Sequence, residues 1–402
     1  MLVVFLHGWG VRTPDYGPLP DRLRAVPGLS IADVWLSQYI TYSDSVTMDD
    51  LTEAFERARL ESFPNQKFAC ITHSTGGPLA REWAARYTNS SELMTHLVML
   101  APPNHGSALA QLGKGRISRL ASWFEQQEPG AQILNWLELG SRESWRLNLD
   151  GLDRSSAGFE FTLAGGAIDA KFYDHLNSYT GEKSSDGVVR TAAANLNYSY
   201  VELAQSGGGL VVKNKKRSSP NAFGVVPAVS HSGASMGIVS SPVTAEWVKK
   251  CLAVGNDSDY QHVSDELQQL TSQATQAGSM IVVRVTDAIG RPVNDYDLYL
   301  TGGPAYSPDA LPKGFFIDRQ RNQVTPNVLT YYLDHAAFEQ SKELGLKIVA
   351  RPDSGPVSFA PAEFRTDEAT VASILRPHET VMLNLRLERT LSPALFLVRR
   401  AA

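Results

Sequence analysis

Along the first hundred residues, short apolar runs alternate with longer segments whose apolar side chains recur at helical spacing. The apolar runs lie at 2–6, 31–36, 67–73 and 95–101, and the helical patterns lie at 18–26, 49–62 and 77–87. Buried strands that alternate with helices are typical of a parallel sheet with helices on both faces. The pattern therefore predicts an α/β fold for this part of the chain.

The alternation of strand and helix patterns stops in the middle of the chain. Residues 107–157 are rich in aromatic residues and leucines and have few strand signals, so they predict a mostly helical insertion. Strand patterns resume at 159–164 and 198–203, and residues 243–253 predict a closing helix. We expect one domain over residues 1–255.

The chain changes character again after residue 255. Residues 256–279 begin with Asn-Asp-Ser-Asp and continue as a polar helical stretch rich in Gln, Ser and Thr, which is typical of a connector. Beyond it, apolar and polar residues alternate at 280–286, 296–300 and 380–387. We therefore predict a small all-β, sandwich-like domain at 280–402.

Composition agrees with a globular protein of two domains. The chain has 402 residues, which is long for one compact domain, and its hydrophobic fraction of 43% is ordinary. A net charge of −5 gives no support to a nucleic-acid partner. Cys70 and Cys251 are too few for a disulfide framework, and their spacing does not suggest zinc. Cys70 lies in an apolar run and is expected to be buried.

The amino terminus and the hydropathy pattern bear on location. The features of a signal peptide do not fit before the first motif, and no window approaches the roughly 20 apolar residues of a membrane-spanning helix. We expect a soluble protein that is cytoplasmic as synthesised. Secretion by a route that needs no signal peptide stays open.

The strongest chemical signal is Ile-Thr-His-Ser-Thr-Gly-Gly at 71–77, directly after an apolar strand and before a helix. A serine on such a tight turn needs small residues two positions before and after it, in the usual form G-x-S-x-G. Thr72 occupies the first glycine position, which weakens the motif, and a serine at a helix start is also an ordinary cap. We nominate Ser74 as a catalytic nucleophile.

A second motif supplies candidate donors for an oxyanion. His7-Gly8-Trp9-Gly10 follows the first strand, where a loop can bring a backbone N–H toward the nucleophile. We nominate Trp9 as the first donor and Thr75, the residue after the serine, as the second. The alternative is a glycine-rich turn that only ends a strand.

The acid of the site should follow the nucleophile in the chain, because hydrolases with this turn have the order Ser, Asp, His. Asp186 lies on a turn in the run Ser-Asp-Gly-Val-Val at 185–189. Asp169 and Asp174 are rivals, and an aspartate before a glycine is often only a turn residue. We prefer Asp186.

The histidine of the site follows by elimination. Between the middle of the chain and the connector lie only His175 and His231, and His175 precedes Asp186. His231 would take the proton of Ser74 and later give it to the leaving alcohol, while Asp186 fixes its tautomer.

Taken together, four segments resemble bacterial and eukaryotic lipases of the α/β-hydrolase superfamily. They are HGWG at 7–10, THSTGG at 72–77, APPNHGS at 101–107 and SDGVV at 185–189. The resemblance covers residues 1–250 and extends more weakly to PGAP1-like and lipase-effector branches, which act on phospholipids. It implies hydrolysis of lipid or other ester substrates without a metal or an organic cofactor. The resemblance indicates no particular protein partner. Residues 280–402 resemble no family that we recognise.

Two further features each have two interpretations. The insertion carries Trp123, Phe124, Trp136 and Trp145 where lipases often place a lid; these aromatics either bind acyl chains or form the insertion's own core. The basic run Lys-Asn-Lys-Lys-Arg at 213–217 could meet a phosphate head group or an anionic membrane, but such runs are more often solvated loops, and we expect one here.

The sequence thus predicts a serine ester hydrolase, a lipase or phospholipase, with a Ser74–His231–Asp186 triad and an acyl-enzyme intermediate. One alternative is a short-chain esterase or an acyltransferase that uses the same triad. Another is a non-catalytic scaffold whose β domain binds a partner. A fluorophosphonate probe separates the enzymes from the scaffold, because it labels only an activated serine.

Overall fold

The structure, a computed structural model, describes residues 1–7, 16–34, 44–110, 130–153, 158–168, 183–338, 343–366 and 368–395. The chain divides into two compact units. We call residues 1–197 together with 218–278 the α/β unit, and residues 198–217 together with 279–402 the β unit.

Parallel strands form the six-stranded sheet of the α/β unit, in the order β2-β1-β3-β4-β5-β8. Their bounds are Leu2–His7 (β1), Ser30–Val34 (β2), Phe68–His73 (β3), Met94–Leu100 (β4), Phe159–Gly165 (β5) and Ala222–Val226 (β8). Every strand predicted in the first hundred residues lies in this sheet, so the α/β prediction is confirmed. Since the strands are parallel, the loops at their carboxyl ends share one edge of the sheet.

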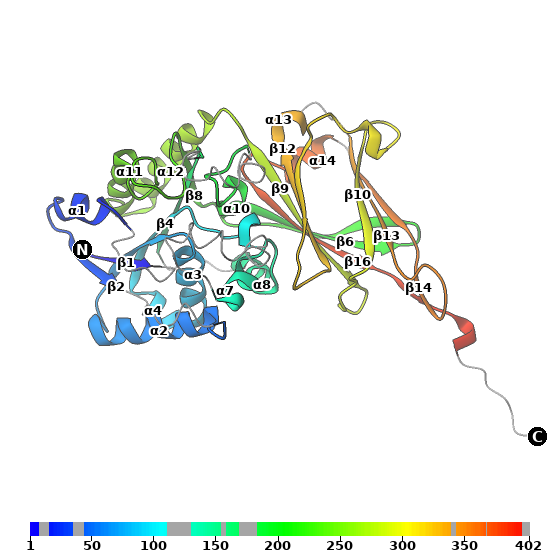
Figure 1. Cartoon of the computed structure of the whole chain (residues 1–402), viewed down its shortest axis with the longest axis horizontal. Coiled ribbons are helices and arrows are strands. Elements are labelled where there is room, and N and C mark those ends of the chain that lie inside the picture. Colours follow the sequence, from blue (N-terminus) through cyan, green and yellow to red (C-terminus); the bar gives the residue numbers. More distant parts are fainter. Residues whose placement is uncertain are drawn as a thin grey trace, which may run out of the picture. The chain divides into compact units, whose positions relative to one another are not determined.

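Helices cover both faces of this sheet (Figure 1). Their bounds are Leu19–Arg24 (α1), Met48–Ser62 (α2), Gly76–Arg86 (α3), Thr88–Ser91 (α4), Ala131–Leu137 (α7), Arg142–Gly151 (α8), Thr191–Ala194 (α10), Pro242–Leu252 (α11) and Asp257–Ser272 (α12). Alternate strand residues such as Phe5, Ile71 and Val98 share one core with α1, α11 and α12. Burial on both faces explains why these strands are apolar runs rather than alternating patterns.

The insertion is helical where the structure describes it, with α7 and α8. Trp136 and Trp145 are each only 4% exposed, so these two aromatics belong to the packed interior. Trp123 and Phe124 lie outside the described residues. The proposal that residues 107–157 form a lid therefore stays a prediction.

The polar stretch predicted as a connector is α12, which packs on the α/β sheet. Leu267 of α12 is fully buried, and a Cβ at Gly224 of β8 would lie 2.6 Å from a Leu267 methyl carbon. The Tyr260 hydroxyl donates to Glu160 O at 2.9 Å and accepts from Ala222 N at 2.9 Å. The polar composition hid a narrow apolar stripe on one side of the helix, and that stripe completes the α/β unit.

The β unit contains a nine-stranded mixed sheet in the order β10-β13-β15-β7-β6-β16-β9-β12-β11 and a small sheet of β14 and β17. The strands are Tyr198–Ser206 (β6), Gly209–Arg217 (β7), Gly278–Asp287 (β9), Tyr296–Gly302 (β10), Phe316–Arg321 (β11), Val328–Asp334 (β12), Leu344–Ala350 (β13), Val357–Phe359 (β14), Ala362–Thr366 (β15), Thr380–Leu387 (β16) and Arg389–Leu391 (β17). Two short helices, His335–Phe338 (α13) and Glu368–Ile374 (α14), accompany them. The predicted C-terminal β domain is present.

The boundary between the units differs from the one predicted, because the hairpin of β6 and β7 belongs to the β unit. β6 pairs in parallel with β16, from Tyr198 opposite Thr380 to Ala204 opposite Arg386. The alternation along β6 buries Val201 in the core of the β unit. β16 lies far from β6 in the sequence. The local pattern therefore predicted a strand but could not predict which sheet the strand joins.

The two ends of the large sheet contact each other through side chains across this core. The Tyr331 hydroxyl of β12 donates to Leu298 O of β10 at 2.6 Å, and the Arg321 guanidinium of β11 donates to Tyr296 O of β10 at 2.9 Å. β10 is at one end of the strand order, and β11 and β12 are at the other. The side chains between them therefore fill a two-layered, sandwich-like core.

Two further observations concern membrane-spanning helices and the two cysteines. Within the described ranges, no helix combines the length and the apolar character needed to cross a membrane. Cys70 and Cys251 are free thiols, and burial raises the pKa of both. The expectation that Cys70 is a small buried residue is confirmed.

Candidate active site

Ser74 occupies the tight turn between β3 and α3. Its φ of 54° places it in the left-handed region, which a non-glycine residue rarely adopts without a constraint. The turn is fixed by Ser74 N donating to Leu100 O at 2.9 Å and by Gly77 N donating to Ser74 O at 3.1 Å. A strained serine at the carboxyl edge of a parallel sheet is the arrangement of a nucleophile elbow.

The close approach in this turn falls on Gly77 rather than on Thr72. Thr72 is fully buried in β3, with Leu6 and Met99 as its neighbours on β1 and β4. A Cβ at Gly77 would lie 2.6 Å from Pro102 Cβ. The sheet therefore has room for a threonine where the motif prefers glycine, while the start of α3 needs a glycine against the loop that follows β4.

The structure brings Ser74, His231 and Asp186 together. His231 Nε2 is 3.1 Å from Ser74 Oγ, and His231 Nδ1 is 2.9 Å from Asp186 Oδ2. Both the histidine and the aspartate are buried, with 5% and 1% of their surface exposed. The rival residues Asp169, Asp174 and His175 lie outside the described residues.

The backbone around Asp186 sets its orientation. Asp186 Oδ1 accepts from Val188 N at 2.9 Å and from Val189 N at 2.7 Å, which leaves Oδ2 to face His231. His231 N also donates to Asp186 O at 3.0 Å. Since the carboxylate only accepts, Nδ1 of His231 carries a proton and Nε2 is free to accept from the Ser74 hydroxyl.

Two residues that sequence reasoning missed support this arrangement. Gly165 ends β5, and a Cβ there would lie 2.8 Å from Asp186 Cβ and 2.6 Å from Val229 O, so only glycine admits the aspartate. His73 precedes Ser74, and its Nε2 is 3.1 Å from His231 O, with the two imidazole rings 4.9 Å apart. The place of His73 inside the serine motif was the one available signal.

The two nominated oxyanion donors differ in status. Thr75 is 1% exposed and directly precedes α3, where the first backbone N–H groups lack helical partners. Among the described residues, no hydrogen bond uses the Thr75 N–H. Trp9 lies outside the described residues, so its role stays a prediction.

The segment APPNHGS connects the serine turn to the insertion and to the Asp186 loop. Arg81 of α3 donates to Asn104 Oδ1 at 3.2 Å and to Asn148 Oδ1 of α8 at 2.9 Å. His105 N donates to Ala193 O at 2.9 Å. Burial lowers the pKa of His105 to about 3, and the nearby Arg81 adds to this, so its imidazole is neutral at physiological pH. This histidine acts in packing and hydrogen bonding.

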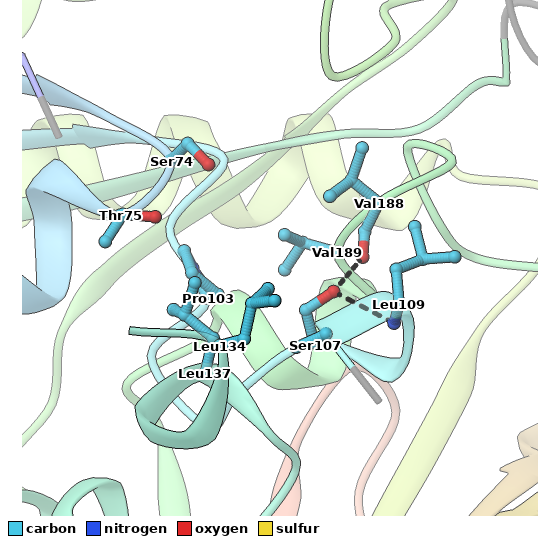
Figure 2. Close-up of a pocket in the computed structure, with 10 residues that line it drawn as sticks. Ser74, Thr75, Pro103, Ser107, Leu109, Leu134, Leu137, Val188 and Val189 are labelled. Carbon is cyan, nitrogen blue, oxygen red and sulfur yellow. Dashed lines mark hydrogen bonds between the residues drawn. The ribbon is translucent and has the colours of Figure 1, made fainter. Parts of the chain in front are cut away.

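An apolar cavity of about 20 Å³ lies beside Ser74 (Figure 2). Leu134 and Leu137 of α7 line it, together with Ser74, Thr75, Pro103, Ser107, Leu109, Ala110, Val188 and Val189. Ser107 Oγ donates to Val188 O at 2.7 Å and thereby ties the start of the insertion to the Asp186 loop (Figure 2). The insertion thus contributes an apolar wall to the site.

Within the described ranges, no group of three or more His, Cys, Asp or Glu side chains is placed to hold a metal ion.

The parallel sheet, the strained serine turn and the serine–histidine–aspartate arrangement define the class of α/β hydrolases. A sequence model described as the alpha/beta hydrolase fold matches residues 26–147. A search of curated protein sequences finds no match to the chain.

Solved structures give a more specific relationship. Phospholipase PlaB from Legionella pneumophila matches with 39% sequence identity and a TM-score of 0.91, over 99% of this chain and 96% of that one. The same protein in complex with thio-NAD matches with 39% identity and a TM-score of 0.90, over the same shares. The chain belongs to the family of α/β-hydrolase lipases and phospholipases that includes this protein, and it is a hydrolase that acts on esters.

Proposed function

We propose that the protein is a phospholipase that cleaves the carboxylic esters of phospholipids through an acyl-enzyme on Ser74. The observation that carries the proposal is the continuous contact from Ser74 Oγ to His231 Nε2 at 3.1 Å and from His231 Nδ1 to Asp186 Oδ2 at 2.9 Å. The choice of a phospholipid rests on the similarity to phospholipase PlaB over nearly the whole chain.

In the first half of the reaction, His231 Nε2 takes the Ser74 proton as Oγ bonds to the ester carbonyl carbon. The carbonyl electron pair moves to oxygen, and the N–H groups of Thr75 and Trp9 stabilise the oxyanion. Removal of one such donor typically costs about 10²–10³ in rate. The bond to the alcohol then breaks, and His231 gives its proton to the leaving oxygen.

In the second half, water attacks the acyl group on Ser74. His231 takes a proton from this water and returns it to Ser74 Oγ as the carboxylic acid leaves. Asp186 stays ionised throughout and stabilises the imidazolium. Its orientation is preset by the two backbone N–H groups that hold Oδ1.

The part of the acyl chain next to the ester carbonyl is assigned to the apolar cavity beside Ser74. Its walls are leucine, valine, alanine and proline side chains, which offer apolar contact and little hydrogen bonding. A phospholipase also meets its substrate in aggregates, so we propose that the protein works in contact with a membrane surface.

A second candidate, hydrolysis of short-chain esters, is favoured by the size of this cavity. A volume of about 20 Å³ holds little more than one water-sized group. A series of p-nitrophenyl esters of increasing chain length, measured beside phospholipid vesicles, distinguishes the two. A short-chain esterase would lose activity steadily as the acyl chain grows.

The direct test is Ser74→Ala with Ser235→Ala as the matched control, since Ser235 is exposed on the loop that carries His231. We expect Ser74→Ala to lower ester hydrolysis by at least about 10⁴-fold and to abolish labelling by a fluorophosphonate probe. Ser235→Ala should keep both, and both variants should melt like the unchanged protein. Labelling or hydrolysis that survives in Ser74→Ala would contradict the proposal.

A further inference from the structure

The β unit encloses a second apolar cavity, which has a volume of about 70 Å³. Side chains of β6, β9 and β16 form one wall, and side chains of β10, β13 and β15 form the opposite wall. The register explains the first wall, because Val381 lies opposite Ile281 and Leu383 lies opposite Val201. α14 contributes Val371 and covers the space between the two walls. All the described lining residues therefore belong to the β unit.

The lining of this cavity offers little hydrogen bonding. Among the described residues that line it, only Thr366 carries a polar side chain, and the others are leucine, isoleucine, valine, phenylalanine and glycine. A buried water needs two to four polar partners, so this lining holds water poorly. One water-sized group needs roughly 10–15 Å³, so the cavity accommodates several such groups. Its size and chemistry therefore suit a segment of hydrocarbon chain.

The cavity reaches the surface on the side of β15 and α14. Phe364, Thr366 and Ile374 are partly exposed, whereas the other described lining residues are buried. β15 meets β7 where Glu363 lies opposite Gly209, and the described residues form no further pair between these two strands. We call the region of Phe364, Thr366 and Ile374 the mouth of the cavity.

A lysine of β7 lies close to this mouth. The basic run at 213–217, expected to be a solvated loop, is instead part of this strand. Lys215 lies opposite Val201 of β6, and residues directly opposite each other share one face of a sheet. Lys215 is therefore on the face that encloses the cavity. Its ammonium donates to Ser373 Oγ of α14 at 2.7 Å, and Ser373 directly precedes Ile374 of the mouth.

The charges around the mouth leave this ammonium able to bind an anion. Glu363, the acidic residue of β15, is already bound by Arg365 at 3.1 Å and by Lys347 at 3.3 Å. Among the described residues, Lys215 is paired with the neutral hydroxyl of Ser373 rather than with a carboxylate. An anionic group at the mouth would replace this hydroxyl as the acceptor and form a stronger, charge-assisted hydrogen bond.

We propose that the cavity binds the hydrocarbon chain of a fatty acid and that Lys215 binds its carboxylate at the mouth. The apolar lining alone would accept any small apolar molecule, and the lysine alone would accept any anion. Together they fit an anion with an apolar tail. The protein is a hydrolase that acts on esters, and cleavage of a carboxylic ester releases an acid of this kind. The site lies in the β unit and does not depend on the reaction proposed at Ser74.

A simpler interpretation is that the cavity is a gap left by imperfect packing. An unfilled apolar cavity destabilises a core, and added methylene groups restore the missing contacts. Val371→Leu/Val381→Leu would then raise the melting temperature, and no acid would bind to the unchanged chain. A binding site instead loses affinity for its ligand when these methylene groups fill it.

The test titrates octanoate into the full chain with Ser74→Ala, in which the isoleucine δ1 methyl groups carry ¹³C. Ile281 and Ile374 line the cavity, while Ile133 of α7 lies next to Leu134 beside Ser74. We expect the NMR signals of Ile281 and Ile374 to shift, and Ile133 reports any binding near Ser74. Affinity should rise about fourfold for each methylene group added to a shorter acid and level off once the cavity is full.

Two kinds of variant separate the carboxylate from the chain. Lys215→Gln should weaken octanoate binding about fivefold and leave the binding of octanol, which has the same chain without the charge, unchanged. Lys213→Gln is the matched control, because it removes the same charge from an exposed position two residues earlier in β7. It should bind octanoate like the unchanged chain. Val371→Leu/Val381→Leu should weaken both ligands roughly 15-fold, the value of two methylene groups.

Four outcomes would overturn the inference. These are no binding of octanoate by the unchanged chain, shifts confined to Ile133, equal losses in Lys213→Gln and Lys215→Gln, and undiminished binding by the filled variant. Melting curves check that each variant is folded. Because the test reads binding in a chain that lacks the Ser74 hydroxyl, the fatty-acid site and the proposed reaction can fail separately.

Discussion

The sheets of the two units are assembled from the chain in opposite ways. In the α/β unit, β3, β4 and β5 follow one another in the chain and lie side by side, each joined to the next by a crossover. In the β unit, the hairpin of β6 and β7 lies in the middle of a sheet whose other strands come from residues 278–387. One sheet is built locally, and the other depends on a segment contributed from the middle of the chain.

The hairpin of β6 and β7 comes from a part of the chain that lies between two candidate catalytic residues. Residues 198–217 lie between Asp186 and His231 in the chain, so the segment between two candidate catalytic residues leaves the α/β unit and returns to it. The exit and the return are tied together, since Asn197 Nδ2 donates to Asn221 O at 2.8 Å and Asn221 N donates to Asn197 Oδ1 at 2.9 Å. These two hydrogen bonds hold both ends of the excursion together within the α/β unit.

The largest predicted effect comes from comparing two fragments that end at different residues. A 1–255 fragment keeps the hairpin without β16 and loses α12, which covers β8. We expect it to be insoluble or unfolded, because it exposes the apolar face of β6 and part of the α/β core. Solubility and a melting transition measure this outcome.

The matched fragment is 1–278 with residues 198–217 replaced by a short glycine linker between Asn197 and Ser218. It keeps α12 and removes the orphaned hairpin. We expect it to fold and to hydrolyse a soluble short-chain ester. If the 1–255 fragment folds and the linked fragment does not, the division into units is wrong.

A second prediction uses pH to separate the units. Burial, with a further effect of His335, lowers the pKa of His378 in the β unit from 6.5 to about 4. Between these values the unfolded chain binds the proton and the folded chain does not, so stability present at neutral pH is lost as the pH falls from 6.5 toward 4. A shift of this size removes up to about 3 kcal/mol.

His378→Asn should abolish this part of the acid sensitivity, and asparagine tolerates the left-handed φ of 59° at this position. All seven tryptophans lie at or before residue 247 and outside the hairpin, within the α/β unit. Urea unfolding followed by far-UV circular dichroism should therefore change in the variant, while tryptophan fluorescence should change little. Unaltered acid sensitivity in both signals would contradict the assignment.

The same contrast explains what could be predicted from the sequence. Ser74 is signalled by six neighbouring residues. Asp186 was preferred over its rivals Asp169 and Asp174 because it lies in the run at 185–189, and His231 followed by elimination, so short motifs and their order along the chain were enough to propose one site. The sheet of β6 could not be predicted, because its partner β16 lies far along the chain and its own alternation fits either unit. α12 was missed because a helix with one narrow apolar stripe has the composition of a linker. Gly165 was missed because its importance depends on a contact with Asp186.

The smallest predicted effect concerns His73, which acts on the site through His231. Its Nε2 is 3.1 Å from His231 O, and its ring lies against the His231 ring. His73 is thus a positioning residue that supports the backbone of the histidine loop.

His73→Leu removes the donor, and the expected loss in kcat is about 10-fold, since small displacements of a proton-transferring group are costly. KM for a soluble ester should stay close to its original value. His73→Gln keeps an N–H donor near the same place and should recover part of the rate, which a residue needed only for packing would not show. Steady-state kinetics with the three proteins, together with their melting temperatures, measure this. Equal activity of the leucine variant and the unchanged protein would show that the contact has no catalytic consequence, and a rise in KM without a fall in kcat would place His73 in substrate binding instead.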